Sequence, residues 1–306
     1  MSTMKLANVL RIGILLAASQ SLLCQAMPTA VASSCAFASK QIPGRAPSAR
    51  GGTEFAHQVA SIGEHDRDEA IRRELLAGNL PAFLRSAVPI QLIGRALGGA
   101  LTRITLCVLP DYLSVGSDAD YVLVPMSLHA ALSVARAFGF TLPTRKIVDA
   151  IYAQSAVRLQ PLPLPASDQM RSTEYFVWHN ALVRTQRKAI GAPLGELTAG
   201  DKKDLVITNR LWRFPDRVAI YGWHRDEGEP IQPLSTFHGA RYADYSHGVR
   251  LVSTTAMVEG QPTSIFDVLG STRLAPILSD EGPLPDLAAL QSAMGGNAPV
   301  PGEAHH

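Results

Sequence analysis

Cysteine is scarce in this chain of 306 residues, which contains only Cys24, Cys35 and Cys107. Neither Cys35 nor Cys107 has a histidine beside it in the sequence, so neither resembles an activated thiol nucleophile. Cys107 lies in an apolar, strand-like run, whereas Cys35 lies among small residues. The sequence therefore allows two outcomes: one Cys35–Cys107 disulfide, as in an exported protein, or a buried, inert thiol at Cys107.

An excess of charge of one sign is also absent. The formal net charge is +2, and the lysines and arginines are spread through the chain without a basic stripe. Proteins that bind nucleic acids concentrate basic residues on one face. The sequence therefore predicts no nucleic-acid partner. The composition, 46% hydrophobic and 18% charged, is typical of a globular protein with ample material for a core.

The apolar run at residues 12–23 is too short to predict a membrane span. Two basic residues precede this run, and the Ala-Val-Ala sequence at residues 30–32 follows it as a cleavage site. This order is typical of a secretory signal peptide, here residues 1–32, whose removal leaves no stable membrane span. The sequence thus predicts a periplasmic or extracellular protein. A retained amphipathic anchor and a lipoprotein signal at Cys24 are the alternatives.

Internal repeats and a strict alternation of strands and helices are both missing. Residues 88–93 and 102–109 are rich in branched side chains, which is typical of strands. Apolar residues recur with helical spacing in 127–138 and 143–151. This mixture predicts an α+β fold, with a mixed or antiparallel sheet and several packed helices.

The composition also suggests how the chain is divided. After the signal peptide, residues 33–60 are rich in Ser, Ala, Gly and Pro and are predicted to form a flexible linker. We expect one α+β globular domain over residues 61–282. The Pro-, Gly- and Ala-rich residues 283–306 are predicted to form a disordered tail.

Three of the nine histidines, His224, His238 and His247, lie within residues 220–252. Tyrosines, a carboxylate and serines are interleaved with them. Histidine has the side-chain pKa closest to neutrality and is the commonest metal ligand in proteins. The segment therefore predicts a polar functional site.

A zinc site is one interpretation of this segment. His238, Asp244 and His247 lie within ten residues of one another, and His224 is a candidate fourth ligand. Imidazole nitrogens and a carboxylate suit zinc, but no His-Glu-x-x-His motif is present. Because side chains alternate along a strand, these ligands converge only if the chain turns within residues 242–247.

Acid–base catalysis is the second interpretation. A hydroxyl nucleophile needs a base within hydrogen-bond reach, and the base needs an orienting group. Ser246 or Ser235 is a candidate hydroxyl, His238 or His247 the base, and Asp244 the orienting group. Neighbouring residues of a strand point apart, so Ser246 and His247 are a poor pair, and no Gly-x-Ser-x-Gly motif occurs.

The run from Ser246 to Leu251, Ser-His-Gly-Val-Arg-Leu, resembles the active-site signature of the L,D-transpeptidases, which cross-link bacterial cell walls. His238-Gly239 resembles the upstream His-Gly of that family, and the resemblance covers about fifteen residues. The family places a catalytic cysteine after Ser-His-Gly, where this chain has Val249, and no cysteine follows Cys107. The resemblance therefore implies a cell-wall substrate without the thiol mechanism.

Together these patterns predict an exported hydrolase that acts on a glycan, a peptide or a peptidoglycan-type substrate. The candidate catalytic residues are His238, Asp244 and His247, and the candidate substrate-binding residues are Trp223, His224, Tyr242, Tyr245 and Arg250. No cofactor is expected, with zinc as the alternative. A non-catalytic binding protein, a zinc-dependent hydrolase and a purely structural role for the segment are the competing interpretations.

Two features outside the segment have simpler interpretations. Lys202, Lys203 and Asp204 are typical of a solvated turn. His179 lies near a predicted helix start, where capping or packing is the expected role, although it is a further candidate for the site.

Overall fold

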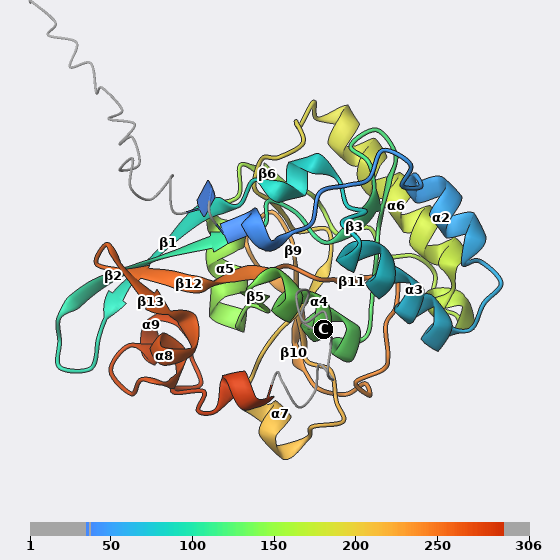
Figure 1. Cartoon of the computed structure of the whole chain (residues 1–306). Coiled ribbons are helices and arrows are strands. Elements are labelled where there is room, and N and C mark those ends of the chain that lie inside the picture. Colours follow the sequence, from blue (N-terminus) through green and yellow to red (C-terminus); the bar gives the residue numbers. More distant parts are fainter. Residues whose placement is uncertain (1–34, 37, 291–306) are drawn as a thin grey trace, which may run out of the picture.

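The computed structural model describes residues 35–36 and 38–290 (Figure 1). The predicted signal peptide and residues 291–306 of the predicted tail lie outside this range. The prediction of disorder is wrong for residues 283–290, because the apolar side chains of Leu284 and Leu287 are buried in the core. Helices combine with antiparallel and mixed sheets in one domain, which confirms the predicted α+β class. None of the helices in this part of the chain is both long and apolar enough to cross a membrane.

A five-stranded antiparallel sheet forms one part of the core. Its strands follow the order β1 (Val88–Arg95), β2 (Leu101–Val108), β12 (Val252–Val258) and β13 (Gln261–Ser264), and β5 (Phe140–Thr141) also pairs with β12. Residues 101–104 of β2 alternate between exposed and buried positions, the rest of β2 is buried, and β1 buries Ile90 and Leu92. The predicted strands at 88–93 and 102–109 are therefore present and pair as a hairpin.

A second, mixed sheet carries the histidine-rich segment. Its order is β10 (Pro230–Ser235), β9 (Ile220–His224), β8 (Lys203–Leu205) and β11 (His247–Gly248). β11 is parallel to β8, whereas the other two pairings are antiparallel. Two smaller ladders join β3 (Ser114–Gly116) to β4 (Tyr121–Leu123) and β6 (Val157–Arg158) to β7 (Thr198–Ala199).

Helix α5 (Arg145–Gln154) contacts both large sheets, through β9 and β1. Thr144 starts this helix by accepting a hydrogen bond from the Ile147 amide. Helix α4 (Leu128–Phe138) starts with a similar cap from Ser127 and ends at Gly139, whose φ of 76° suits glycine. Both helices confirm the apolar spacing seen in the sequence.

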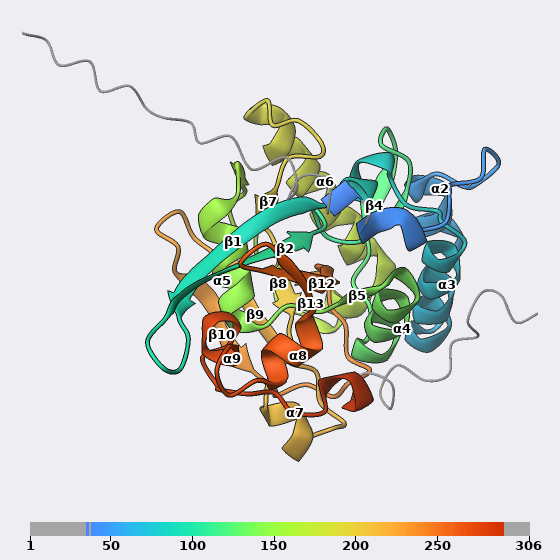
Figure 2. The ribbon, with the colours of Figure 1, turned by 60° about the vertical axis from the view of Figure 1, so that its left-hand side comes forward.

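The remaining helices form two groups (Figures 1 and 2). On one side, α4 is accompanied by α2 (Gly52–Gln58), α3 (Glu64–Leu76) and α6 (Thr173–Ala189). The second group consists of α7 (Arg210–Arg213), α8 (Ile265–Gly270) and α9 (Ala275–Leu278). The described residues also form short 3₁₀ helices, namely η1 (Ser39–Gln41), η2 (Ala82–Arg85) and η3 (Asp168–Arg171).

The N-terminal part of the domain differs from the predicted linker. Residues 38–60 include α2, and Phe55 and Val59 are buried in the main core. The aromatic and branched side chains of this stretch outweigh the effect of its small residues. Cys35 is bonded to Cys107 of β2, with Cα atoms 5.3 Å apart, so the disulfide alternative is correct.

Loss of the disulfide is expected to lower the free energy of unfolding by about 2–4 kcal/mol, because the bond closes a long loop and restricts the unfolded chain. Urea denaturation of the wild type and of a Cys35→Ser/Cys107→Ser variant measures this difference. Reductant should weaken the wild type to a similar extent and leave the variant unchanged. Equal midpoints for the oxidised wild type and the variant would contradict the prediction.

A buried ion pair links α6 to the strands beside it. The Arg187 Nη2 atom lies 2.5 Å from Asp111 Oδ2 and 3.0 Å from the Thr198 hydroxyl, while Nη1 donates to the Pro193 carbonyl at 3.2 Å. The two charged side chains are only 6% and 5% exposed. The Tyr112 amide donates to the other Asp111 oxygen. Each charge is therefore compensated inside the protein.

Candidate functional site

The loop between β10 and β11 folds back on itself and brings a carboxylate beside a histidine. The His247 amide donates to the Asp244 carbonyl at 3.0 Å, which closes a turn. The Ser246 amide and hydroxyl both donate to Asp244 Oδ1, at 2.8 and 2.5 Å. The turn within residues 242–247 that is needed to bring these side chains together is therefore present.

The second oxygen of Asp244 faces two aromatic rings. Tyr242 donates its hydroxyl to Oδ2 at 3.0 Å, and His247 Nε2 lies 3.9 Å from the same atom. Burial opposes ionisation of Asp244, but His247, the Ser246 donors and the Lys203 ammonium outweigh it and lower the pKa to about 2. Asp244 is thus ionised at neutral pH.

His247 is a neutral imidazole beside this carboxylate. The side chain is 1% exposed, and burial lowers its pKa to about 4 even though Asp244 favours the charged form. No described residue makes a hydrogen bond to either ring nitrogen. Buried polar atoms are rarely left unpaired in proteins, so we consider His247 a candidate functional position.

His238 and Tyr242 cover this pair. Their rings stack 3.9 Å apart at 6°, and the edge of Tyr242 meets the His247 ring at 5.6 Å. Both are part-exposed, and burial lowers the pKa of His238. The structure therefore brings the three predicted catalytic residues, His238, Asp244 and His247, into one cluster around Tyr242.

A surface pocket of about 570 Å³ adjoins His238. Phe214 and Phe237 line it and are 53% and 78% exposed, and Arg217 supplies its charged group. His238 therefore belongs both to the lining of this pocket and to the stack of rings beside His247.

Lys203 of strand β8 and Lys202 just before it complete the cluster, and the sequence interpretation did not place them there. Lys203 pairs with His247 across the parallel ladder, and the ammonium lies 4.9 Å from the centre of the Trp223 ring. The prediction of a solvated turn is wrong here, since Lys202 and Asp204 are 1% and 3% exposed. The apolar residues that follow, from Leu205 on, were the available signal that these charges begin a buried strand.

Lys202 contacts a further histidine beneath the cluster. Its Nζ atom lies 3.0 Å from His179 Nδ1 and 2.5 Å from the Tyr245 carbonyl oxygen. Burial lowers the pKa of Lys202 to about 8, and burial together with Lys202 lowers that of His179 to about 2. His179 is therefore a neutral acceptor in the middle of α6, which is neither a cap nor simple packing.

Trp223 has an unusual backbone that fixes this arrangement. Its φ is 59°, and the preceding Gly222 has a φ of 106°. A bulky residue in the left-handed region carries strain that its surroundings must offset. Its amide donates to the Lys202 carbonyl at 3.1 Å, and its indole donates to the Asp201 carbonyl at 3.0 Å. Trp223, which is 5% exposed, thus fixes the two residues that precede β8.

Other predicted substrate-binding residues are also buried, where their side chains make hydrogen bonds to the backbone. Tyr245 is 2% exposed, and its hydroxyl accepts a hydrogen bond from the Leu164 amide. Arg250 is 0% exposed and donates to two backbone carbonyls, those of Leu109 and Thr198. Only Tyr242, among the five candidates, lies part-exposed at the cluster.

His224 contacts side chains of helix α5. Its Nε2 atom lies 3.0 Å from Asp149 Oδ1 on α5, and its ring stacks on Tyr152. Within residues 35–36 and 38–290, no three His, Cys, Asp or Glu side chains are grouped so that they could hold a metal ion. The geometry therefore gives no support to the zinc alternative.

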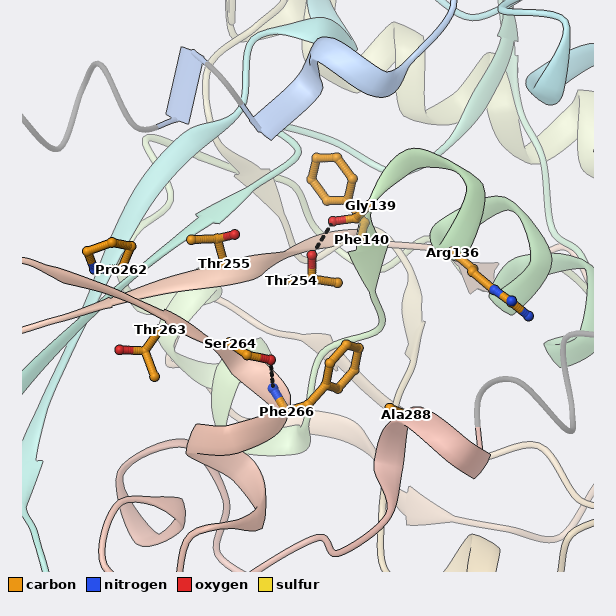
Figure 3. Close-up of a pocket in the computed structure, with 10 residues that line it drawn as sticks. All are labelled: Arg136, Gly139, Phe140, Thr254, Thr255, Pro262, Thr263, Ser264, Phe266 and Ala288. Atoms are coloured by element: carbon orange, nitrogen blue, oxygen red, sulfur yellow. Dashed lines mark hydrogen bonds between the residues drawn. The ribbon is translucent and has the colours of Figure 1, made fainter. Parts of the chain in front are cut away.

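A second pocket of about 570 Å³ lies between α4, β12, β13 and α8 (Figure 3). Its polar lining consists of hydroxyl groups from Thr254, Thr255, Thr263 and Ser264, together with Arg136. None of the residues that line it is a histidine, a carboxylate or a lysine. It lacks an acid or base of suitable pKa, so the His247 cluster is the better candidate for chemistry.

Comparisons with known proteins do not extend these observations. Neither a family model, nor a curated protein, nor a solved structure matches this chain.

Proposed function

We propose that this protein is an exported hydrolase whose general base is His247. The observation that carries the proposal is a neutral imidazole, without a hydrogen-bond partner among the described residues, held beside an ionised carboxylate. A base must be deprotonated before it acts, and the imidazolium that forms gains from a nearby negative charge. His247 and Asp244 meet both conditions at neutral pH.

In the proposed reaction, a His247 nitrogen accepts a proton from water while the water oxygen forms a bond to the carbon of the scissile bond. The bond from this carbon to the leaving nitrogen or oxygen breaks, and the imidazolium returns its proton to the leaving group. Asp244 stabilises the resulting imidazolium, and the Lys203 ammonium offsets negative charge that develops on the substrate. Because His247 is 1% exposed, the stacked Tyr242 and His238 rings must turn aside when substrate binds. The proposed substrate is a glycan, a peptide or a peptidoglycan fragment, seated in the pocket beside His238.

A non-catalytic binding protein is the second candidate. The exposed Phe214 and Phe237 rings favour it, because aromatic faces pack on sugars and apolar groups whether or not a bond is cleaved. Titration with peptidoglycan fragments, followed by mass spectrometry of the ligand, separates the two functions. Cleaved fragments support the hydrolase, whereas a bound fragment that stays intact supports the binding protein.

The pH dependence of turnover tests the role of His247. Protonation removes the base, and burial places the pKa of His247 at about 4. As the pH falls, kcat/KM should therefore stay level through about 5 and decline about tenfold per pH unit below about 4. Initial rates on a cleaved peptide or glycan would measure this profile. An acid limb near 6.5, the usual value for an exposed histidine, would argue for a different base.

A further inference from the structure

The hairpin of β1 and β2 extends beyond the body of the protein next to α9 (Figures 1 and 2). Gly98 and Gly99 lie in its three-residue loop, with φ values of 100° and 91° that glycine adopts without strain. The Leu97 amide donates to the Arg273 carbonyl at 2.9 Å. The tip is thus tied to the connection between α8 and α9 and has a defined position.

One face of this hairpin exposes large aliphatic side chains. Ile93, Leu97 and Leu101 are 56%, 69% and 67% exposed. Single exposed hydrophobic residues are ordinary, but three at one tip form a patch that a partner would cover. The opposite face, which includes Leu92 and Ile104, is buried and holds the hairpin in place.

Arginines alternate with these aliphatic residues. Ile93 lies opposite Arg103 and Arg95 lies opposite Leu101, so the exposed face is a checkerboard of apolar and cationic side chains. Arg273 adds a third exposed arginine beside the tip. An apolar patch among cations is complementary to an anionic lipid surface, where aliphatic groups enter the acyl region and arginines meet the phosphates.

The free edge of β1 is less suited to pairing with another strand. Pro89 lacks an amide hydrogen. The Gln154 side chain accepts from the Gln91 amide and donates to the Gln91 carbonyl, each at 2.9 Å. Both the proline and the side-chain cap discourage addition of a strand at this edge. The flat face, rather than the edge, is therefore the surface available to a partner.

We propose that the tip of the β1–β2 hairpin docks this protein on a membrane surface that contains anionic phospholipids. Ile93, Leu97 and Leu101 enter the interface, and Arg95, Arg103 and Arg273 bind headgroup phosphates. This attachment is peripheral and independent of the proposed hydrolysis. It would hold an exported enzyme against the envelope.

Flotation of the full chain with vesicles tests the proposal. Wild-type protein should bind vesicles of phosphatidylglycerol and phosphatidylcholine far more strongly than vesicles of phosphatidylcholine alone. A Leu97→Ser/Leu101→Ser variant should bind the anionic vesicles at least about tenfold more weakly. Replacing the three arginines with glutamine should weaken binding about a hundredfold, at about fivefold for each charge. High salt should reproduce that loss in the wild type.

Ile190→Ser is the matched control, because Ile190 is 57% exposed at the end of α6, away from the hairpin. It should bind as the wild type does. The N-terminal apolar segment is common to all variants, so differences between them report on the hairpin alone. Equal binding by wild type and Leu97→Ser/Leu101→Ser, or equal binding to both vesicle types, would overturn the proposal. So would a wild-type dimer that this double variant converts to a monomer, since a second copy would then cover the face.

Discussion

A His247→Asn variant is expected to lose about 10²- to 10⁴-fold in kcat/KM, the usual contribution of a general base. Asparagine fits the space and stays neutral, but it cannot accept a proton at neutral pH. The acid limb at about 4 should disappear with the base, because the remaining activity no longer depends on this titration. Initial rates measured across the pH range would show both effects.

The fold should survive this substitution. Asparagine leaves a small void and buries an amide at a site 1% exposed, so the free energy of unfolding should fall by about 1–3 kcal/mol, which leaves the protein folded. His57→Asn, at an exposed histidine of α2, is the matched control and should keep full activity. A folded His247→Asn protein with undiminished turnover would exclude His247 as the base.

An Arg187→Met variant is expected to lower the free energy of unfolding by about 3–5 kcal/mol, because it leaves Asp111 charged and unpaired in the interior. Methionine keeps much of the volume of the side chain, so the cost reports on the charge rather than on a cavity. Asp201, which is also buried, raises the cost further, since burial and then Asp111 already raise its pKa to about 6. Urea denaturation at neutral pH measures the loss.

The double variant Arg187→Met/Asp111→Asn provides the control. Removing both charges should recover a large part of the lost stability, because a buried pair costs desolvation that its absence avoids. Losses that simply add in the double variant would show that the two side chains act independently, which would contradict the pairing.

The fold class and the strongest helices could be predicted from local sequence. Thr144 and Ser127 cap α5 and α4, and the apolar stripes behind them are visible in the sequence. The sequence showed that the candidate site residues meet only if the chain turns near Asp244, but it could not predict that this turn forms. Its formation depends on how the Asp244 carboxylate captures the Ser246 donors.

Burial of charge was the main property that the sequence did not indicate. Lys202 and His179 are 23 positions apart in the chain, and Arg250 is 0% exposed although arginine is normally a surface residue. Charged side chains enter a core only when distant partners meet them there, and no local pattern encodes such partners. For residues 38–60, composition predicted a flexible linker, whereas a few apolar side chains are enough to hold this stretch against the core.

The parallel pairing of β11 with β8 has a consequence for folding. Lys203 and His247 become neighbours only when the long stretch between them, which contains β9 and β10, has closed into a loop. Contacts between distant residues form slowly, since a long loop must close before they contribute. We therefore expect the pairing of β8 with β11 to form late in folding, so that a chain in which this pairing is missing lacks the proposed active site.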